Sequence, residues 1–180
     1  RKRPPDWRVR GQPRPTPPPS VQSAGGPSEY DVTSFDGTRI RVHWFPNPNA
    51  TGSTRLPTVL KGPGWGLSGD TDARTRGNGL FGDVSIANLW DAGFNVLTWD
   101  PRGFGKSSGT VSVDAPGTEG HDVQVLLDWI AARPNVQLDA PRDPRVGMVG
   151  GSYGGGIQLV LAGIVCRVDA IVPTIAWHSL

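Results

Sequence analysis

The sequence has 180 residues, which suits one domain, and 36% of them are hydrophobic, enough for a core. The formal net charge of +2 is unevenly divided: residues 1–27 carry six basic side chains against one acid, and the remainder carries twelve against fifteen. The basic character therefore belongs to the N-terminal segment, and a nucleic-acid-binding domain is disfavoured. The single cysteine, Cys166, excludes a disulfide framework and a cysteine-based zinc site.

Residues 1–27 are rich in proline and lack apolar periodicity, so we interpret them as a disordered, basic linker rather than as a segment that binds an anionic surface. The longest apolar stretch, 157–165, is far shorter than the roughly 20 residues that span a bilayer, so no membrane span is predicted. The compartment stays open, with secretion slightly favoured over the cytoplasm.

The folded part is expected to begin near Ser28 with two strands, 29–34 and 39–45, joined as a hairpin. In the second strand apolar and polar residues alternate, which predicts that Arg41 and His43 lie on a solvent-exposed face.

Short apolar runs and helical patterns then alternate along the chain, as in a mostly parallel α/β sheet. With the N-terminal hairpin, residues 28–180 are therefore expected to form one folded unit built around such a sheet. The predicted strands are 58–60, 94–99, 146–149 and 170–175, and the predicted helices are 83–92, 122–132 and 155–165.

The pattern Gly-x-Ser-x-Gly occurs twice, around Ser152 and around Ser107. A nucleophile elbow needs a strand directly before the serine and a helix directly after it. Ser152 meets both conditions, whereas Ser107 lies in a predicted loop. Ser152 is therefore the predicted nucleophile.

The loop 100–107 resembles a phosphate-binding P-loop, which is the main competing interpretation. Asp100 replaces the first glycine and would repel phosphate, and Pro101 removes one backbone N–H group. No helix is predicted after the loop. A nucleotide-hydrolysing enzyme is therefore disfavoured.

An oxyanion hole needs two N–H donors. One is predicted to be the backbone N–H of Tyr153, directly after the nucleophile, and the other comes from the loop 61–66. Pro63 has no N–H group, so the backbone N–H of Trp65 is the first choice. The Trp65 indole and the Gly64 amide are alternatives, and a plain glycine-rich turn also stays open.

None of the three histidines is a satisfactory general base. His43 is predicted to be a surface residue and His121 a solvated residue at a helix start. His178 would lie at the same sheet edge as Ser152, but the order in this fold is serine, acid, histidine, and no acid follows Asp169.

Three motifs together resemble the X-Pro dipeptidyl-peptidases and cocaine-esterase-like acyl hydrolases over roughly 28–180. They are Trp-Asp-Pro-Arg-Gly-x-Gly at 99–105, Asp-Trp-Ile-Ala at 128–131 and Gly-Gly-Ser-Tyr-Gly-Gly at 150–155. The resemblance implies that residues 28–180 are the N-terminal part of an α/β-hydrolase domain, incomplete at its C-terminal end. It also implies a helical cap inserted after the sixth strand and a C-terminal β-sandwich. It further implies a triad whose acid and histidine lie beyond the cap, so we expect them after residue 180.

In that family a tyrosine hydroxyl in the loop after the third strand often supplies an oxyanion donor, and this sequence has Trp65 there. Ser152 and the Tyr153 amide therefore carry over from the resemblance, whereas the second donor departs from it.

The sequence thus predicts a serine hydrolase that cleaves small ester or peptide substrates through an acyl-enzyme, similar to an X-Pro dipeptidyl-peptidase. The alternatives are a non-peptidase acyl esterase of the same fold and a non-catalytic binding module. No cofactor, metal or nucleic acid is implied, and the oligomeric state is not predicted. The 180 residues alone are expected to be nearly inactive.

Overall fold

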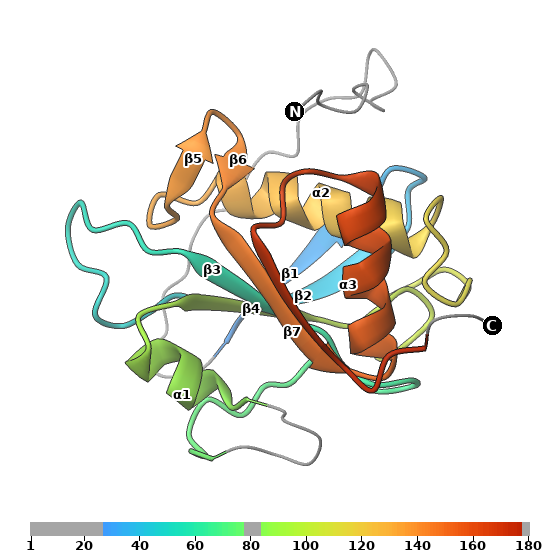
Figure 1. The fold of residues 1–180 in the computed structure, drawn as a ribbon, viewed down its shortest axis with the longest axis horizontal. Coiled ribbons are helices and arrows are strands. Elements are labelled where there is room, and N and C mark those ends of the chain that lie inside the picture. Colours follow the sequence, from blue (N-terminus) through green and yellow to red (C-terminus); the bar gives the residue numbers. More distant parts are fainter. Residues whose placement is uncertain (1–26, 78–83, 178–180) are drawn as a thin grey trace.

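The structure is a computed structural model that describes residues 27–77 and 84–177 (Figure 1). Its centre is a six-stranded sheet with the order β1-β2-β4-β3-β7-β8, and a two-stranded ribbon, β5-β6, lies apart from it. The strands are β1 (Ser28–Thr33), β2 (Arg39–Phe45), β3 (Thr58–Lys61), β4 (Asn95–Trp99), β5 (Leu138–Ala140), β6 (Asp143–Pro144), β7 (Val146–Gly151) and β8 (Ala170–Thr174). The helices are α1 (Ile86–Asp91), α2 (Glu119–Ala131) and α3 (Tyr153–Ile164).

The pairing of the strands confirms a mostly parallel sheet with an N-terminal hairpin. β2 is antiparallel to both β1 and β4, whereas β3 is parallel to β4 and β7, and β7 is parallel to β8. The carboxyl ends of these four parallel strands therefore meet at one edge of the sheet, where ligands bind in open α/β sheets.

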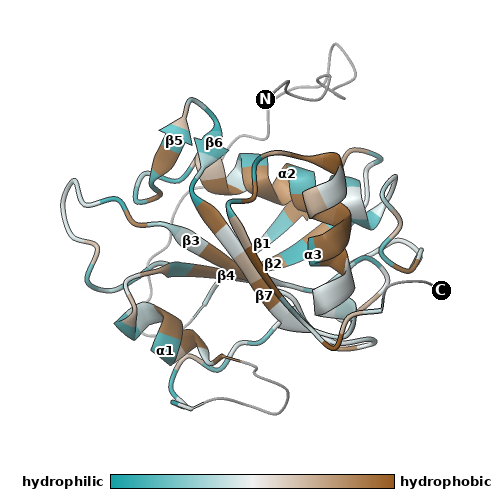
Figure 2. Ribbon diagram, in the orientation of Figure 1, coloured by the Kyte–Doolittle hydropathy of each residue, from teal (hydrophilic) through white to brown (hydrophobic). Residues whose placement is uncertain are grey.

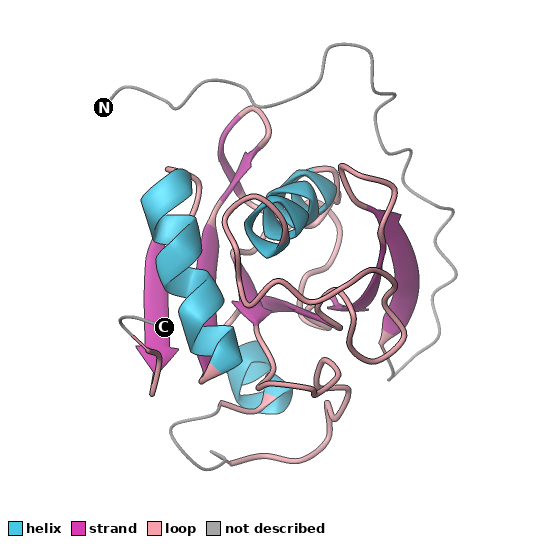
Figure 3. Ribbon diagram, turned by 90° about the vertical axis from the view of Figure 1, so that its right-hand side faces the viewer, coloured by secondary structure: helices cyan, strands magenta, loops and turns pink. Residues whose placement is uncertain are grey.

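Helices cover both faces of the sheet, and each face has its own apolar cluster. In β4, Leu97 and Trp99 pack with α2 and α3, while Val96 packs with α1 on the other face. This alternation follows from the two-residue repeat of a strand. Figure 2 shows the hydrophobic colouring of α3 and the central strands, and the orthogonal view in Figure 3 shows the helices against the twisted sheet. The core thus holds the carboxyl edge of the sheet in place.

The prediction of an exposed face on β2 was wrong. His43 is only 4% exposed: its Nε2 atom lies 3.1 Å from Asp100 Oδ1, and its Nδ1 atom lies 3.5 Å from Glu29 Oε1. Arg41 is half-buried and forms an ion pair with Glu29 at 2.6 Å. Because β2 lies inside the sheet and the loop after β4 covers it, its polar side chains find partners in the protein rather than in water.

The other differences concern element ends. α2 begins at Glu119, three residues before the predicted start, and the β5-β6 ribbon was not predicted. α1 begins at Ile86, where the side chain of Ser85 accepts a hydrogen bond from the Asn88 amide. Residue 83 of the predicted helix, and all of the predicted linker except Pro27, lie outside the described residues. No helix among the described residues is long and apolar enough to cross a membrane.

Candidate active site

Ser152 occupies a tight turn between a strand and a helix. β7 ends at Gly151 and α3 begins at Tyr153, so Ser152 is the only residue between them. Its φ of 53° lies in the left-handed region, which is costly for a residue with a β-carbon. The Ser152 N–H donates to Thr174 O at 2.9 Å, and its side chain makes no capping hydrogen bond to α3. The backbone at Ser152 is thus strained, and its hydroxyl is not used to cap α3.

Glycines let the loop after β3 pass against this turn. A β-carbon added to Gly154 would lie 2.3 Å from Gly62 O, and one added to Gly150 would lie 2.6 Å from the same oxygen. The Gly62 N–H also donates to Val149 O at 2.9 Å. These positions therefore need glycine because backbone meets backbone. The close approach brings the loop 62–66 beside the start of α3.

Replacing Gly154 with alanine is expected to destabilise the protein by about 3 kcal/mol, because the new methyl group would push two backbones apart. Gly163, in the last turn of the same helix, is the matched control, since a β-carbon there meets nothing within 4 Å. Gly163→Ala should raise stability by up to about 1 kcal/mol through helix propensity. Urea unfolding measures both, and equal effects would contradict the close-packing argument.

Gln158 ties this turn to the sheet. Its side chain is fully buried: Nε2 donates to Gly150 O at 3.2 Å and to Gly154 O at 2.7 Å, and Oε1 accepts from the Val172 N–H at 2.9 Å. One amide thereby joins β7, α3 and β8. Sequence reasoning missed this role, although a lone glutamine inside an otherwise apolar helix was a usable signal.

The structure brings Trp65 and Tyr153 together, as their predicted places at one sheet edge require. The Leu67 N–H donates to Gly64 O at 3.2 Å, so residues 64–67 form a β-turn with Trp65 at its second position. The third position needs glycine, because Gly66 has a φ of 74°. The Trp65 ring is 5.2 Å from that of Tyr153, and Trp65 is 56% exposed.

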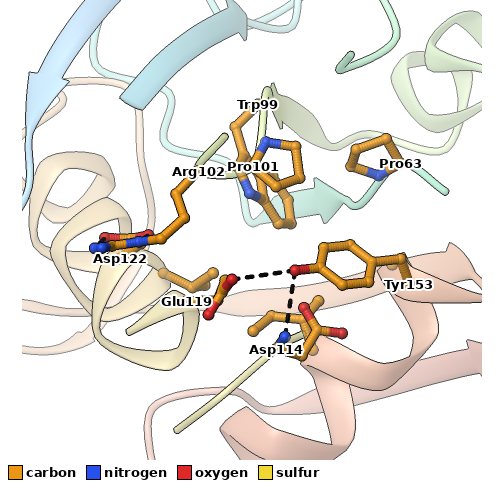
Figure 4. Close-up of a pocket in the computed structure, with 11 residues that line it drawn as sticks. Pro63, Trp99, Pro101, Arg102, Asp114, Glu119, Asp122 and Tyr153 are labelled. Carbon is orange, nitrogen blue, oxygen red and sulfur yellow. Dashed lines mark hydrogen bonds and ion pairs between the residues drawn. The ribbon is translucent and has the colours of Figure 1, made fainter. Parts of the chain in front are cut away.

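Behind Tyr153 lies a small cavity lined by apolar and acidic side chains (Figure 4). Tyr153 is 2% exposed, and its hydroxyl accepts from the Asp114 N–H at 3.2 Å and donates to Glu119 Oε1 at 3.2 Å. Glu119 also accepts from the Ser112 N–H at 2.5 Å. The cavity has a volume of about 10 Å³, roughly the room for one water molecule. Tyr153, the residue after Ser152, is therefore held at its hydroxyl by a buried acid, Glu119.

Asp114 is the most perturbed acid of this cavity. It is 3% exposed, and burial, together with the nearby charge of Glu119, raises the pKa of its carboxyl to about 8, although contacts with Tyr153 and the Ile157 amide oppose the shift. Burial likewise raises the pKa of the Tyr153 hydroxyl. Sequence reasoning did not single out Asp114, because nothing in its local pattern shows how deeply it is buried.

The loop after β4 encloses the carboxylate of Asp100. This carboxylate accepts from the Gly69 N–H at 2.9 Å and the Lys106 N–H at 2.7 Å. Burial acts to raise the pKa of Asp100, but the hydrogen bonds from His43 and these two amides outweigh it and keep the pKa below its usual value. The side chain of Asp100 thus occupies the Lys106 amide, which a P-loop would offer to phosphate.

The other candidate residues have partners elsewhere in the fold or lie outside the described residues. Ser107 is a loop residue, as predicted: its Oγ donates to Asp100 O at 2.6 Å and accepts from the Arg41 N–H at 2.8 Å. His121 is half-buried against the Phe35 ring at 4.9 Å rather than solvated. His178 lies outside the described residues. Within 27–77 and 84–177, no three His, Cys, Asp or Glu side chains are grouped as metal ligands would be.

A buried ion pair supports the same sheet edge from the side of α2. Arg102 donates through Nε to Asp122 Oδ2 at 2.8 Å and through Nη2 to Asp122 Oδ1 at 2.7 Å, and its Nη1 reaches Asp36 Oδ2 at 2.9 Å. Ser34 also donates to Asp122. The hydrogen bonds with Asp122 raise the pKa of the Arg102 guanidinium, so it stays charged despite its burial.

The family model described as X-Pro dipeptidyl-peptidase (S15 family) matches residues 36–180. An uncharacterised 31.7 kDa protein of Escherichia coli is 31% identical over 87 residues, which are 48% of this chain and 29% of that protein.

Solved structures show the same fold at low sequence identity. A hypothetical protein of Pseudomonas aeruginosa has a TM-score of 0.63 at 24% identity, over 86% of this chain and 44% of that one. A Pyrococcus furiosus esterase has a TM-score of 0.60 at 20% identity, over 87% and 57%. An alpha/beta hydrolase from a Penicillium species has a TM-score of 0.59 at 22% identity, over 81% and 44%. The chain thus has the predicted α/β-hydrolase fold and spans about half the length of these structures.

Proposed function

The chain belongs to the X-Pro dipeptidyl-peptidase (S15) family, and we propose that it is a serine hydrolase that cleaves esters or peptides through an acyl-enzyme. The observation that carries this proposal is the turn at Ser152. A serine with a φ of 53° directly between a strand and a helix has the geometry of a nucleophile elbow, which presents its hydroxyl at the carboxyl edge of the sheet.

In this proposal Ser152 Oγ attacks the carbonyl carbon of the substrate and gives its proton to a histidine that we expect after residue 180. The negative charge that develops on the substrate oxygen is stabilised by the backbone N–H of Tyr153, the first residue of α3. The dipole of a helix N-terminus adds to this stabilisation. Collapse of the tetrahedral intermediate breaks the bond to the alcohol or amine, which leaves with the proton from that histidine. The acyl-Ser152 ester that remains is then hydrolysed by water.

A fluorophosphonate probe tests the nucleophile. It should label the full-length protein at Ser152, as located by peptide mass spectrometry, and labelling should disappear in Ser152→Ala. Ser107→Ala is the matched control from the second Gly-x-Ser-x-Gly motif and should label normally. A folded protein that stays unlabelled would favour a non-catalytic binding module and would overturn the proposal.

We assign the second oxyanion donor to the backbone N–H of Trp65. Trp65→Pro removes this N–H at a turn position where proline is favoured, and Trp65→Ala removes the same ring but keeps the N–H. We therefore expect Trp65→Pro to lower kcat about 10²-fold relative to Trp65→Ala, the scale of one lost donor. Equal rates for the two variants would reject the backbone donor. A loss common to Trp65→Ala and Trp65→Phe would instead indicate the indole N–H.

We propose X-Pro dipeptidyl-peptidase activity as the specific reaction, on the strength of the family match. Peptide p-nitroanilides with proline as the second residue should then be cleaved with a higher kcat/KM than simple aryl esters. The reverse preference would indicate a non-peptidase acyl esterase, which the esterases among the structural neighbours keep as the second candidate.

A further inference from the structure

We propose that Asp114 is a positioning residue that acts in its protonated form: it fixes the Tyr153 side chain and, through it, the backbone beside Ser152. This inference rests on the proposed function, because it concerns how the proposed oxyanion donor is held in place. It predicts that the enzyme loses activity in alkaline solution when Asp114 ionises, even though Asp114 does not touch the substrate.

The first argument is the environment of the carboxyl group. Asp114 Oδ2 is buried and has no hydrogen-bond partner among the described residues. It faces the first turns of α3 so closely that a β-carbon on Gly156 would lie 2.7 Å from it. A charged oxygen in such a place would be neither solvated nor paired, whereas a neutral carboxyl group avoids most of that cost.

The second argument concerns the charged groups around Asp114, which do not compensate a negative charge. Glu119 and Tyr153 share the cavity with it. Contacts with the Tyr153 hydroxyl and the Ile157 amide favour the ionised form of Asp114, but burial and the charge of Glu119 outweigh them. Arg102 and Asp122 also line the cavity, but Arg102 is engaged by Asp122 and by Asp36 (Figure 4). An ionised Asp114 would therefore meet an acid and no free cation among the described residues.

The third argument is strain in the backbone that carries Asp114. Val113 and Asp114 both have a φ of 56°, a conformation that is unfavourable for valine in particular. Such strain persists only where surrounding contacts enforce it. One contact that holds the segment is the hydrogen bond from the Asp114 N–H to the Tyr153 hydroxyl. Repulsion between an ionised Asp114 and Glu119 would favour release of this strained segment and loss of that bond.

The last step connects the cavity to the reaction. The Tyr153 ring is anchored at its hydroxyl by the bonds to Asp114 and Glu119, and it packs against Trp65 and Phe104 with ring centroids at 5.2 and 5.5 Å. The N–H proposed as oxyanion donor belongs to the same residue. A shift of this ring therefore moves the donor, and a displacement of that kind weakens transition-state binding more than substrate binding.

The test compares the pH dependence of kcat for the wild-type full-length protein, Asp114→Asn and Asp139→Asn. In the wild type kcat should fall about tenfold per pH unit above a midpoint near pH 8, with little change in KM. Asp114→Asn, which stays neutral, should keep a kcat within about threefold of wild type at pH 7 and should lose this decline. Asp139→Asn removes a partly exposed carboxylate of β5 and should keep the wild-type profile. An alkaline decline that persists in Asp114→Asn would overturn the proposal.

Two readouts separate this inference from the proposed function. Fluorophosphonate labelling of Ser152 at pH 7 tests the nucleophile alone, and it should succeed whether or not Asp114 positions Tyr153. Difference infrared spectroscopy of the wild type should show a protonated carboxyl band that is lost near pH 8, and it needs no folded variant. If no carboxyl group titrates in that range, the role of Asp114 is rejected while Ser152 can still be the nucleophile.

Discussion

Ser152→Ala in the full-length protein should reduce kcat by about 10⁴-fold or more and leave KM nearly unchanged. The reason is that alanine removes the attacking oxygen while the contacts that bind substrate stay. The variant should also be as stable as the wild type, because serine and alanine both carry a β-carbon and thus share the strain of a φ near 53°. Steady-state kinetics with a peptide p-nitroanilide and an aryl ester, together with thermal unfolding, provide the measurements.

Two controls make this prediction specific. Ser107→Ala should keep kcat within about threefold of wild type, because the Ser107 hydroxyl bonds to Asp100 O and to the Arg41 N–H of β2 rather than taking part in the reaction. Ser152→Gly should be as inactive as Ser152→Ala but more stable by about 1 kcal/mol, since glycine relieves the left-handed strain. A Ser152→Ala protein with near wild-type kcat would show that another group forms the acyl intermediate.

The turn at Ser152 illustrates why part of the candidate site could be predicted from sequence. A strand, a serine between glycines and a periodic helix form a local pattern, so the position of Ser152 at the sheet edge needed no long-range information. The same holds for the parallel strands, whose continuous apolar runs reflect burial on both faces. Element ends were less accurate, as the early start of α2 at Glu119 shows.

What could not be predicted depends on contacts between distant segments. His43 has the sequence context of an exposed strand residue, and its burial follows only from the loop that places Asp100 against it. Asp114 and Tyr153 are 39 residues apart, yet they are joined by a hydrogen bond. Polar residues of this kind carry no local signal, because their partners come from elsewhere in the chain.

Arg102→Met should have the largest effect on stability among the changes considered, a loss of about 3–5 kcal/mol. The guanidinium is buried and forms two hydrogen bonds with Asp122, which is itself 3% exposed. Without Arg102, the carboxylate of Asp122 would be a buried charge, and its one remaining side-chain partner among residues 27–77 and 84–177 would be the Ser34 hydroxyl. Urea unfolding at pH 7 measures the loss as a lower midpoint with an unchanged slope.

A double variant separates the stability that the ion pair itself adds from the cost of leaving the Asp122 carboxylate unpaired. Arg102→Met combined with Asp122→Leu replaces both charges by apolar side chains, so most of the stability lost in Arg102→Met should return. Arg145, whose side chain is half exposed beside Asp139, is the matched surface control, and Arg145→Met should change the midpoint little. If the double variant were as unstable as Arg102→Met, the cost would lie in lost packing around α2 rather than in an unpaired carboxylate. Recovery would instead show that the ion pair adds little to the free energy of unfolding beyond what apolar side chains provide at the same place.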